Sequence, residues 1–376
     1  MEARERDGLR RKVLEAFREQ GFVPEVFESP MPGENKDHLR RLHARAVAYL
    51  RDKARPHLAA KEPKLLGYIG SGRRIDPFRI RPVLLRVQRR SFEELLFRYA
   101  RLHWSIPVSS GYGRRLRFLV WDGHHDKLIG LIGLSDPVFA LRPRDRWVGW
   151  DAETKRHRLK SVMDAFVLGA VPPYAQMLGG KLVALAVWSS EVRQAFKERY
   201  GNRPTRILGE RALDLAMITT TSALGRSSLY NRVRYRGHLV YQPVGYTQGT
   251  GDLPFLNGLY QDLAELVRRH ARPTAKRAEW GQGYRNRREV ITKALKLLDL
   301  PEGLRVHGVK REVYVVPMGP DARAFLRGEQ PHFTPYEYSF EELAGYALER
   351  WVWPRARRDM RYRSFDPETW RLWGRS

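Results

Sequence analysis

Two apolar runs joined by a short polar turn constrain the fold of this chain more than any other feature of its sequence. The stretch RLRFLVWDGHHDKLIGLIGLS, residues 115–135, carries an Asp-Gly pair, Asp122 and Gly123, between the two runs. An Asp-Gly pair between apolar runs is typical of a β-hairpin, because it fits the tight turn that the twist of paired strands favours. We therefore predict two strands joined by a turn here.

Strand-like and helical segments alternate along the chain after this hairpin. An apolar run at 164–171 leads to a helical pattern at 179–201, which ends at Gly201, a residue type common at helix ends. A strand at 212–222, a short helix at 229–235 and a strand at 239–247 are predicted next. Alternation of this kind around one core predicts an α/β (α+β) fold with a mixed sheet.

The two ends of the chain differ from this middle part. Residues 1–105 are predicted to be a mostly helical, mixed region, and residues 106–252 to form the core. Residues 253–376 carry two amphipathic helices and then GLRVHGVKREVYVVPM (303–318), which predicts a hairpin or wing. The last residues interleave arginine with aromatic side chains. Such a tail either stacks on nucleic-acid bases or packs back on the core through its tryptophans, and we favour packing.

The charge of the chain is strongly one-sided. Lysine and arginine total 69 against 42 aspartates and glutamates, a formal net charge of +27. Such an excess attracts polyanions and predicts nucleic acid, DNA in the first place, as the partner. The alternative is that arginine only covers solvated faces.

Composition also excludes several classes of protein and site. The chain has no cysteine, which excludes disulfides, thiolate zinc sites and cysteine nucleophiles. No stretch is apolar enough to span a membrane, and the charged N-terminus has no signal-peptide core. We therefore expect a cytoplasmic protein with no membrane partner.

A glycine-bearing turn follows the apolar run at 164–171. AVPPYAQMLGGKLVALA, residues 170–186, places Gln176, Gly179, Gly180 and Lys181 at the start of the next helix. Backbone amides at a helix start readily bind an anion such as a phosphate. The sequence therefore predicts an amide-lined anion site, whose ligand is a cofactor pyrophosphate or a nucleic-acid phosphate.

The order hairpin, strand, glycine-bearing turn, helix, strand, short helix and strand resembles the GNAT acetyltransferase fold. The resemblance implies that the turn binds the pyrophosphate of coenzyme A through its amides, in a pattern Gln/Arg-x-x-Gly-x-Gly/Ala. This sequence matches at Gln176 and Gly179 but has Lys181 at the last position. A lysine there either meets a phosphate by its charge or blocks the path of the cofactor. Because the net charge is +27, nucleic-acid phosphate is the favoured anion.

A second resemblance covers roughly residues 110–330 and rests on six segments in order. They are WDGHHDKLIGLIGLSDPVF, RDRWVGWD, VMDAFVLGAVPPYAQMLGGKLVALA, TTTSALGRSSLYNR, GYRNRREVITKALKLLDL and HGVKREVYVVPM. Together they are similar to the DruA family, which is named for a component of the Druantia anti-phage system and has relatives near mobile elements. The resemblance implies a role in defence or mobile DNA, with other defence-system proteins as partners. It supplies no settled reaction.

Hydroxyls and guanidiniums form two further groups of candidate phosphate contacts. The first follows the strand at 212–222 and comprises Arg226, Ser227, Ser228, Arg232 and Arg234. Such a group suits a phosphate, unless a serine only caps the short helix and the arginines are solvated. The second joins a helix start with the predicted wing, an arrangement that grips duplex DNA. It comprises Arg285, Arg287, Arg288, Lys310 and Arg311.

Three aspartates and one tyrosine are candidate catalytic residues. Asp136, Asp145 and Asp164 lie at the ends of apolar segments, and convergent carboxylates bind Mg²⁺ and support phosphodiester cleavage. Each aspartate also has a structural alternative, such as a turn, an ion pair or a cap, and no metal ligands are assigned. Tyr230 is a candidate nucleophile for a phosphotyrosyl link, although a tyrosine on a helix more often packs.

Three functions follow from these features. The favoured one is a DNA-binding protein of an anti-phage or mobile-element system that nicks or remodels DNA with partners, with Mg²⁺ as cofactor if it cleaves. The second is an acyltransferase that uses coenzyme A. The third is a scaffold of a defence complex with no chemistry of its own.

Overall fold

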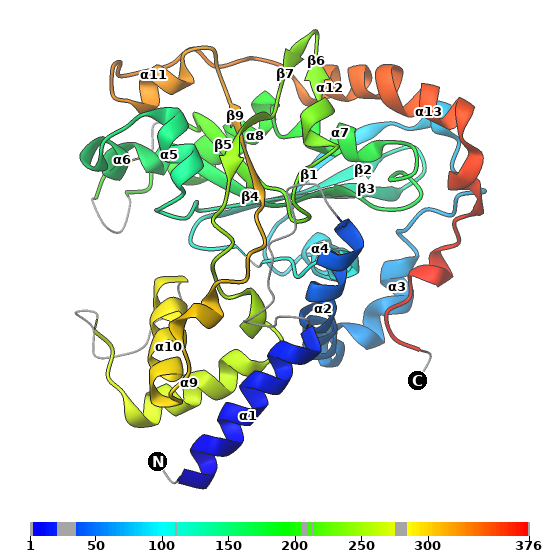
Figure 1. The fold of residues 1–376 in the computed structure, drawn as a ribbon. Helices are drawn as coiled ribbons and strands as arrows, with labels where there is room; N and C mark the ends of the chain where they lie inside the picture. The colour runs from blue at the N-terminus through cyan, green and yellow to red at the C-terminus, as the bar shows by residue number, and fades with distance from the viewer. Residues whose placement is uncertain are drawn as a thin grey trace.

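A seven-stranded mixed sheet forms the centre of the computed structural model, which describes residues 3–20, 35–109, 111–204, 209–211, 214–274 and 284–374. The strands follow the order β1-β2-β3-β4-β5-β9-β8 (Figure 1). Their bounds are β1 Pro82–Arg86, β2 Arg115–Asp122, β3 Lys127–Ser135, β4 Val162–Ala170, β5 Met217–Thr221, β8 Gln242–Tyr246 and β9 Glu312–Pro317. A separate ribbon pairs β6 (Arg234–Tyr235) with β7 (His238–Leu239).

The predicted hairpin is confirmed as β2 and β3, which pair in antiparallel register from Arg115 opposite Ser135 to Asp122 opposite Lys127. The buried carboxylate of Asp122 accepts hydrogen bonds from the amides of His124 (3.0 Å) and His125 (3.3 Å) and so closes the turn. β1 and β4 extend the sheet on either side of the hairpin, both antiparallel.

β4 and β5 pair in parallel, and their pairing covers three residues. Val162 lies opposite Met217, Met163 opposite Ile218 and Asp164 opposite Thr219. Past this point β4 continues beside β3 and β5 continues beside β9. A parallel connection needs a crossover, which α7 (Gly179–Ala186) and α8 (Ser190–Phe196) supply, with α7 packed on β3 and β4.

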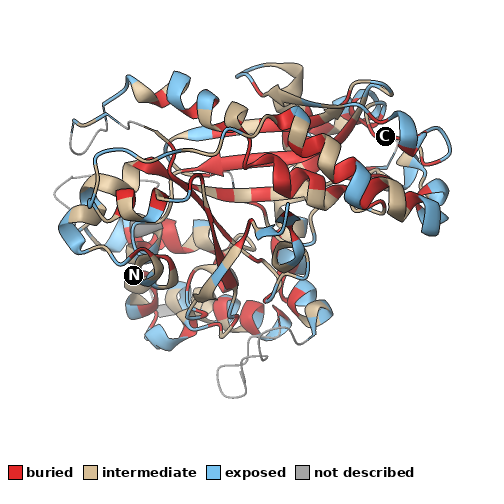
Figure 2. Ribbon diagram, turned by 90° about the horizontal axis from the view of Figure 1, so that it is seen from above, coloured by how far each residue is buried: buried red, intermediate tan, exposed pale blue. Residues whose placement is uncertain are grey.

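Helices cover both faces of the sheet, and buried residues run along its strands (Figures 1 and 2). α12 (Phe340–Ala347) packs on α7, and α13 (Trp353–Arg358) follows it. On the opposite face, α3 (Glu62–Leu66) and α4 (Phe92–Ala100) share an apolar cluster with β2 and β3. α5 (Arg142–Val148) packs on β8 and β9, and α11 (Ala322–Leu326) packs on α6 (Ala152–Arg158).

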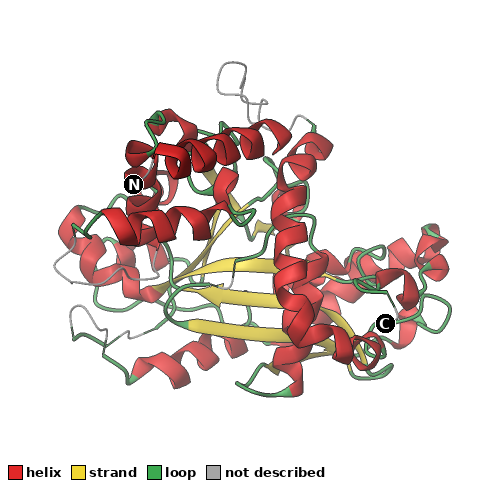
Figure 3. Cartoon of the chain, turned by 90° about the horizontal axis from the view of Figure 1, so that it is seen from below, coloured by secondary structure: helices red, strands yellow, loops and turns green. Residues whose placement is uncertain are grey.

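A second apolar core joins helices from distant parts of the sequence. These are α1 (Ala3–Gln20), α2 (Lys36–Leu58), α9 (Leu259–His270) and α10 (Tyr284–Leu297). Val13, Leu42, Leu263 and Ile291 are fully or almost fully buried among them. These helices lie below the sheet in Figure 1, and the view from below in Figure 3 shows helices crossing under the strands.

The single long helix predicted at 179–201 is wrong, because the structure divides it. α7 ends at Ala186, α8 begins at Ser190, and a π-turn spans Lys197–Gly201. Contacts with distant segments hold the break: the indole of Trp188 donates to the carbonyl of Pro317 (2.8 Å), and the amide of Ser190 donates to that of Tyr338 (2.8 Å).

The predicted wing at 303–318 is also wrong. Residues 312–317 form β9, which lies inside the sheet between β5 and β8. Val313, Tyr314, Val315 and Val316 are all fully buried. A short continuous apolar run of this kind is typical of a strand buried on both faces.

All three predicted regions of the chain contribute strands to this sheet, and the division at residues 105 and 252 stays a prediction. The aromatic tail packs on the body, as favoured: Trp370 stacks on His103 (3.7 Å), Trp373 is 7% exposed, and the indole of Trp353 donates to the carbonyl of Pro77 (2.9 Å). Within the described residues, none of the helices has the length and apolar character needed to cross a membrane.

Candidate nucleic-acid interface

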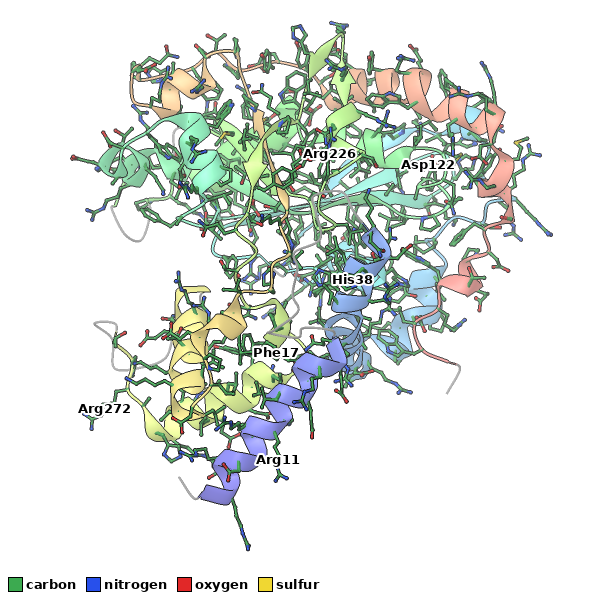
Figure 4. All side chains as sticks on the ribbon, in the orientation of Figure 1. Arg11, Phe17, His38, Asp122, Arg226 and Arg272 are labelled. Atoms are coloured by element: carbon green, nitrogen blue, oxygen red, sulfur yellow. The ribbon has the colours of Figure 1, made fainter. Side chains whose placement is uncertain are left out.

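A large cleft separates the sheet from the helical core formed by α2, α9 and α10. Its volume is about 1950 Å³, and residues from α2, α5, α9, α10 and the segments 98–115, 244–256 and 307–311 line it. Figure 4 places Arg226 and Asp122 in the sheet-bearing part of the molecule and Phe17 and Arg11 on the helices below. The lining includes Phe255 and Ala264 of the helical core and Leu58 and Leu102 of the cluster that packs on the sheet, so the cleft lies between these two apolar clusters.

The cleft is lined almost entirely by one sign of charge. Its lysines and arginines are Lys53, Arg98, Arg101, Arg115, Arg142, Arg146, Arg268, Arg287, Arg288 and Arg311, which we call the cleft cations. Among the described lining residues, Asp252 is the acidic one. A concave surface of one charge sign focuses the field and concentrates polyanions.

The cleft cations lack the carboxylate partners that other arginines of this chain have. Arg114, Arg117 and Arg144 lie within ion-pair distance of Asp136, Glu94 and Asp145. Of the cleft cations, Arg287 is the one with a described carboxylate in range, at 4.0 Å from Asp252. The charge of the others is therefore available to an external anion.

Burial and crowding of like charges both disfavour the charged form of Arg101. Burial, followed by the nearby charges of Arg117, Arg98 and Arg115, lowers the pKa of Arg101 to about 10. A lowered arginine pKa means that the surroundings disfavour the cation. A bound polyanion would relieve that repulsion.

Aromatic residues line the cleft together with the cations. Trp104, Tyr112, Tyr246 and Tyr260 line it, and the guanidinium of Arg287 lies 5.3 Å from the centre of the Tyr260 ring. Rings and guanidinium planes together suit a nucleic acid, because cations meet the backbone while rings stack on bases.

The structure brings some of the predicted phosphate contacts into this cleft. Arg287 and Arg288 on α10 and Arg311, directly before β9, line it, although no wing holds them together. Lys310 is exposed next to Arg311. Arg285 lies in the first turn of α10, and its side chain lies outside the described residues.

The glycine-bearing turn lies elsewhere, and its backbone amides have partners within the chain. The amides of Gln176, Gly179 and Lys181 donate to the carbonyls of Pro173, Tyr174 and Leu178 at 2.8–3.1 Å. Added Cβ atoms would meet Tyr174 O at 2.7 Å from Gly179 and Leu229 Cδ1 at 2.9 Å from Gly180. These glycines therefore allow close packing, and the amides of Gln176, Gly179 and Lys181 are not offered to an anion.

Lys181 packs over the ring of Trp351, with 4.9 Å between Nζ and the ring centre. Burial lowers its pKa, and the nearby charges of Arg232 and Arg350 add to the effect. Lys181 thus joins a small basic group that is distinct from the cleft.

The group at 226–234 is exposed and does not line the cleft. Ser227 Oγ accepts a hydrogen bond from the amide of Tyr230 (3.1 Å). This is the contact expected if the serine only caps the short helix. Arg226, Ser228, Arg232 and Arg234 are solvent-exposed. One guanidinium of this group is already used, because Arg234 Nη1 donates to the carbonyl of Gly237 (3.0 Å).

Two of the candidate catalytic aspartates are held in ion pairs. Asp136 is paired with Arg114 at 2.5 Å, and Asp145 is paired with Arg144 and Lys155, both at 2.7 Å. In the described part of the chain, no group of three or more His, Asp and Glu residues could hold a metal ion. The predicted Mg²⁺ site therefore has no described geometry.

Asp164 and Tyr230 are both partly buried. Burial raises the pKa of Asp164 to about 6, and Thr219 Oγ1 donates to its carboxylate (2.8 Å). Burial also raises the pKa of Tyr230 to about 12, and its ring stacks on Tyr241 with centroids 4.6 Å apart. A phenol held neutral at pH 7 is a poor nucleophile unless a base activates it.

Sequence reasoning missed most of the cleft cations. They are Lys53, Arg98, Arg101, Arg115, Arg142, Arg146 and Arg268. They are scattered over the sequence and form no motif, so the overall charge excess was the signal that pointed to them. Their convergence depends on how α2, α5 and α9 pack.

Comparisons with known proteins agree with the resemblance found in the sequence. The family model of the Druantia protein DruA matches residues 33–328. A curated relative, the Druantia protein DruA of Escherichia coli (strain UMEA 4076-1), is 38% identical over 360 residues, which cover 94% of this chain and 89% of the relative. No solved structure matches the chain. On this agreement over most of its length, the chain belongs to the DruA family.

Proposed function

We propose that this protein binds nucleic acid, DNA in the first place, in the basic cleft, and that it serves an anti-phage or mobile-element system together with other proteins. The cleft cations carry this proposal, because all but Arg287 lack a described carboxylate within ion-pair range. Membership of the DruA family supports the link to defence. We place the protein in the cytoplasm, where such a system meets foreign DNA.

Counterion release gives the proposal a quantitative signature. Each phosphate that a cation neutralises lowers the slope of log K against log salt by about 0.9 for duplex DNA and about 0.7 for single strands. A cleft that engages several phosphates should therefore show a steep salt dependence. The same titration with both kinds of DNA gives the preferred form.

The test compares two double variants of equal net charge. Arg142→Gln with Arg146→Gln removes two exposed cleft cations, whereas Arg89→Gln with Arg156→Gln removes two exposed arginines that do not line the cleft. We expect the cleft variant to bind labelled DNA about tenfold more weakly at 150 mM salt, with a slope flatter by roughly one to two units.

The control variant should stay within about twofold of the unaltered protein, because charge far from the ligand is screened over a Debye length of about 8 Å. Equal losses in the two variants would mean that the overall charge, and not the cleft, binds DNA. The absence of any binding of the labelled DNA by the unaltered protein at 50 mM salt would reject DNA binding itself.

Strand cleavage with Asp136, Asp145, Asp164 or Tyr230 stays a prediction. Half of the binding reactions contain Mg²⁺, and their products are separated on a denaturing gel. Cut strands that disappear in an Asp164→Asn variant would support nicking. Uncut strands under every condition would favour a binding or scaffold role within a larger complex.

A coenzyme A-dependent acyltransferase is the second candidate, and the strand order favours it. We propose that the core is GNAT-like, because hairpin, strand, turn, helix and strand follow each other as that fold requires, and β4 and β5 part after Asp164. The internally bonded amides at 176–181 count against pyrophosphate binding in that turn. A ligand selective for the native state must raise the melting temperature, so acetyl-CoA that leaves Tm unchanged would reject this candidate.

A further inference from the structure

Arg311 is partly buried, with its Nε shielded from solvent, and it differs from the fully buried Arg144 in its lack of a described carboxylate partner. Arg144 is 0% exposed, and its guanidinium is bonded to Asp145 (2.7 Å) and to the carbonyls of Val138 and Phe139 (both 2.8 Å). Arg311 lines the cleft, and no described carboxylate lies within ion-pair distance of it. Burial lowers the pKa of Arg311, with no opposing charge to offset the effect. A cation with a buried, unpaired donor is costly unless a ligand supplies the acceptor and the counter-charge.

The described partner of the Arg311 guanidinium is a neutral ring. Arg311 Nη2 lies 3.4 Å from Nε2 of His43 on α2. A guanidinium has only donors, so His43 Nε2 must accept and the ring proton must sit on Nδ1. Burial, followed by the charges of Arg311 and His307, lowers the pKa of His43 to about 3, so the ring stays neutral at pH 7.

Two donors in this cluster have no described acceptor. His43 is 1% exposed, and its Nδ1 has no hydrogen-bond partner among the described residues; the same holds for the buried Nε of Arg311. Unsatisfied buried donors are rare in proteins, and each calls for an explanation. An excess of donors around an uncompensated positive charge matches the chemistry of an anion.

The backbone holds Arg311 firmly in this position. Its amide donates to Thr247 Oγ1 (3.1 Å), and its carbonyl accepts from the amide of Thr247 (2.9 Å). His307 flanks it, with Nδ1 accepting from the amide of Val309 (3.1 Å). A residue fixed in this way can bind a ligand without a large loss of conformational entropy.

We infer that Arg311, with His43 beside it, forms a phosphate-binding subsite in the floor of the cleft, at which one phosphate group is bound out of water. The inference rests on the proposed function and deepens it. It distinguishes one specific phosphate contact from the general electrostatic attraction of DNA by exposed cations at the rim of the cleft, such as Arg142 and Arg146. The phosphate is either the terminal monoester of a strand or an internal phosphodiester.

The first experiment measures the melting temperature of the full chain with inorganic phosphate against chloride at equal ionic strength. We expect phosphate to raise Tm of the unaltered protein and to have no such effect on an Arg311→Met variant. Without ligand, this variant should melt at or above the unaltered protein, because a cation with a buried, unpaired donor is removed. A purely structural arginine would lower Tm when replaced.

A lack of response of the unaltered protein to phosphate would overturn the inference, and so would an equal response of Arg311→Met. Should Arg311→Met fail to fold, Arg311→Lys takes its place. Lysine keeps the charge but lacks the planar guanidinium with its paired donors, so we expect phosphate to raise Tm less in this variant.

The second experiment measures binding of oligonucleotides with a 5′-phosphate or a 5′-hydroxyl. We expect Arg311→Met to bind at least tenfold more weakly, with a salt slope changed by about one unit, whereas Arg146→Met at the rim loses about threefold. Tighter binding of the 5′-phosphorylated strand would assign the subsite to a terminal monoester. Equal binding of the two oligonucleotides would assign it to an internal phosphodiester. Equal losses in the two variants would overturn the subsite.

The two proposals fail in different ways. If DNA binds and the rim variants weaken it while Arg311→Met does not, the cleft function stands and the subsite is rejected. If no DNA binds at 50 mM salt but phosphate raises Tm through Arg311, the subsite stands and the cleft function is rejected.

Discussion

Gly72 lies directly against the backbone of the C-terminal segment, and only hydrogen fits in that space. A Cβ at this position would come within 1.8 Å of the Tyr362 carbonyl oxygen, and the Gly72 amide donates to the carbonyl of Phe365 (2.9 Å). We expect Gly72→Ala to lower the free energy of unfolding by roughly 3 kcal/mol, because backbone must move to admit the methyl group. Denaturant unfolding measures this loss. Gly303→Ala is the control, since nothing lies within 4 Å of its Cβ, and an equal loss there would refute the steric explanation.

Buried histidines should make the protein sensitive to mild acid. Burial, followed by the charge of Arg51, lowers the pKa of His103 to about 3, and burial also lowers the pKa of His307 to about 4. Because these folded-state values lie below the value of about 6.5 in the unfolded chain, protons bind preferentially to the unfolded state below pH 6.5. The contribution of these neutral histidines to the free energy of unfolding is therefore fully present above pH 6.5 and is lost as the pH drops towards 4.

Replacing His103 with Phe tests this dependence and preserves the stack on Trp370. When the pH is lowered from 7 to 5, we expect the free energy of unfolding to fall by about 1 kcal/mol less for His103→Phe than for the unaltered protein. Urea unfolding at both pH values gives the difference. The exposed His270 provides a control, because His270→Gln should leave the pH dependence as it is. Parallel curves for His103→Phe and the unaltered protein would refute the assignment.

At the scale of elements, Glu62 of α3 binds the C-terminal segment to the core. It is 1% exposed and accepts from Tyr99 Oη (2.9 Å), the amide of Leu372 (2.6 Å) and the amide of Trp373 (3.2 Å). Its loss leaves buried donors unsatisfied, at a cost of about 1–3 kcal/mol each. We expect Glu62→Gln to destabilise the protein by about 2 kcal/mol and to expose residues 360–374 to protease.

The exposed Glu368 is the matched control, since it forms a surface pair with Arg371 (2.7 Å). Surface pairs contribute little, so Glu368→Gln should change stability by less than about 1 kcal/mol. Cleavage of the tail at the same rate in both variants would show that Glu62 does not hold it.

Elements differ in how far the sequence specifies them. The β2–β3 hairpin was predictable because Asp122 and Gly123 determine its turn locally. The break after Ala186 depends on Pro317 and Tyr338, which lie far away in the sequence. β9 was mistaken for a wing for the same reason, because its run of apolar residues does not reveal which strands will flank it.

At the scale of the whole molecule, the net charge of +27 opposes folding through self-repulsion. We expect Tm of the free protein to rise between 20 and 200 mM NaCl, as salt screens this repulsion. DNA affinity should fall over the same range. Calorimetry and binding titrations in the same buffers measure both trends, and a falling Tm without ligand would contradict the role given to self-repulsion.

The candidate site could be predicted only in outline, because it is formed by the packing of the whole molecule. Net charge identifies the class of partner, and Arg287, Arg288 and Arg311 were found because they lie near recognisable elements. Arg101 after α4, Arg142 on α5 and Arg268 on α9 line one cavity only once these elements are packed in space. The glycine-bearing turn was a plausible anion site by sequence, but its amides turned out to be bonded within the chain.

The place of β9 between β5 and β8 has a consequence for biosynthesis. The ribosome makes β8 long before β9, yet β8 has β9 as its neighbour in the described sheet. A nascent chain that has not yet released residue 317 therefore carries an open edge on β5 and an unpaired β8. Open edges invite pairing with other chains, so products of early termination should aggregate. The sheet is therefore completed only after β9 has been made and has entered between β5 and β8.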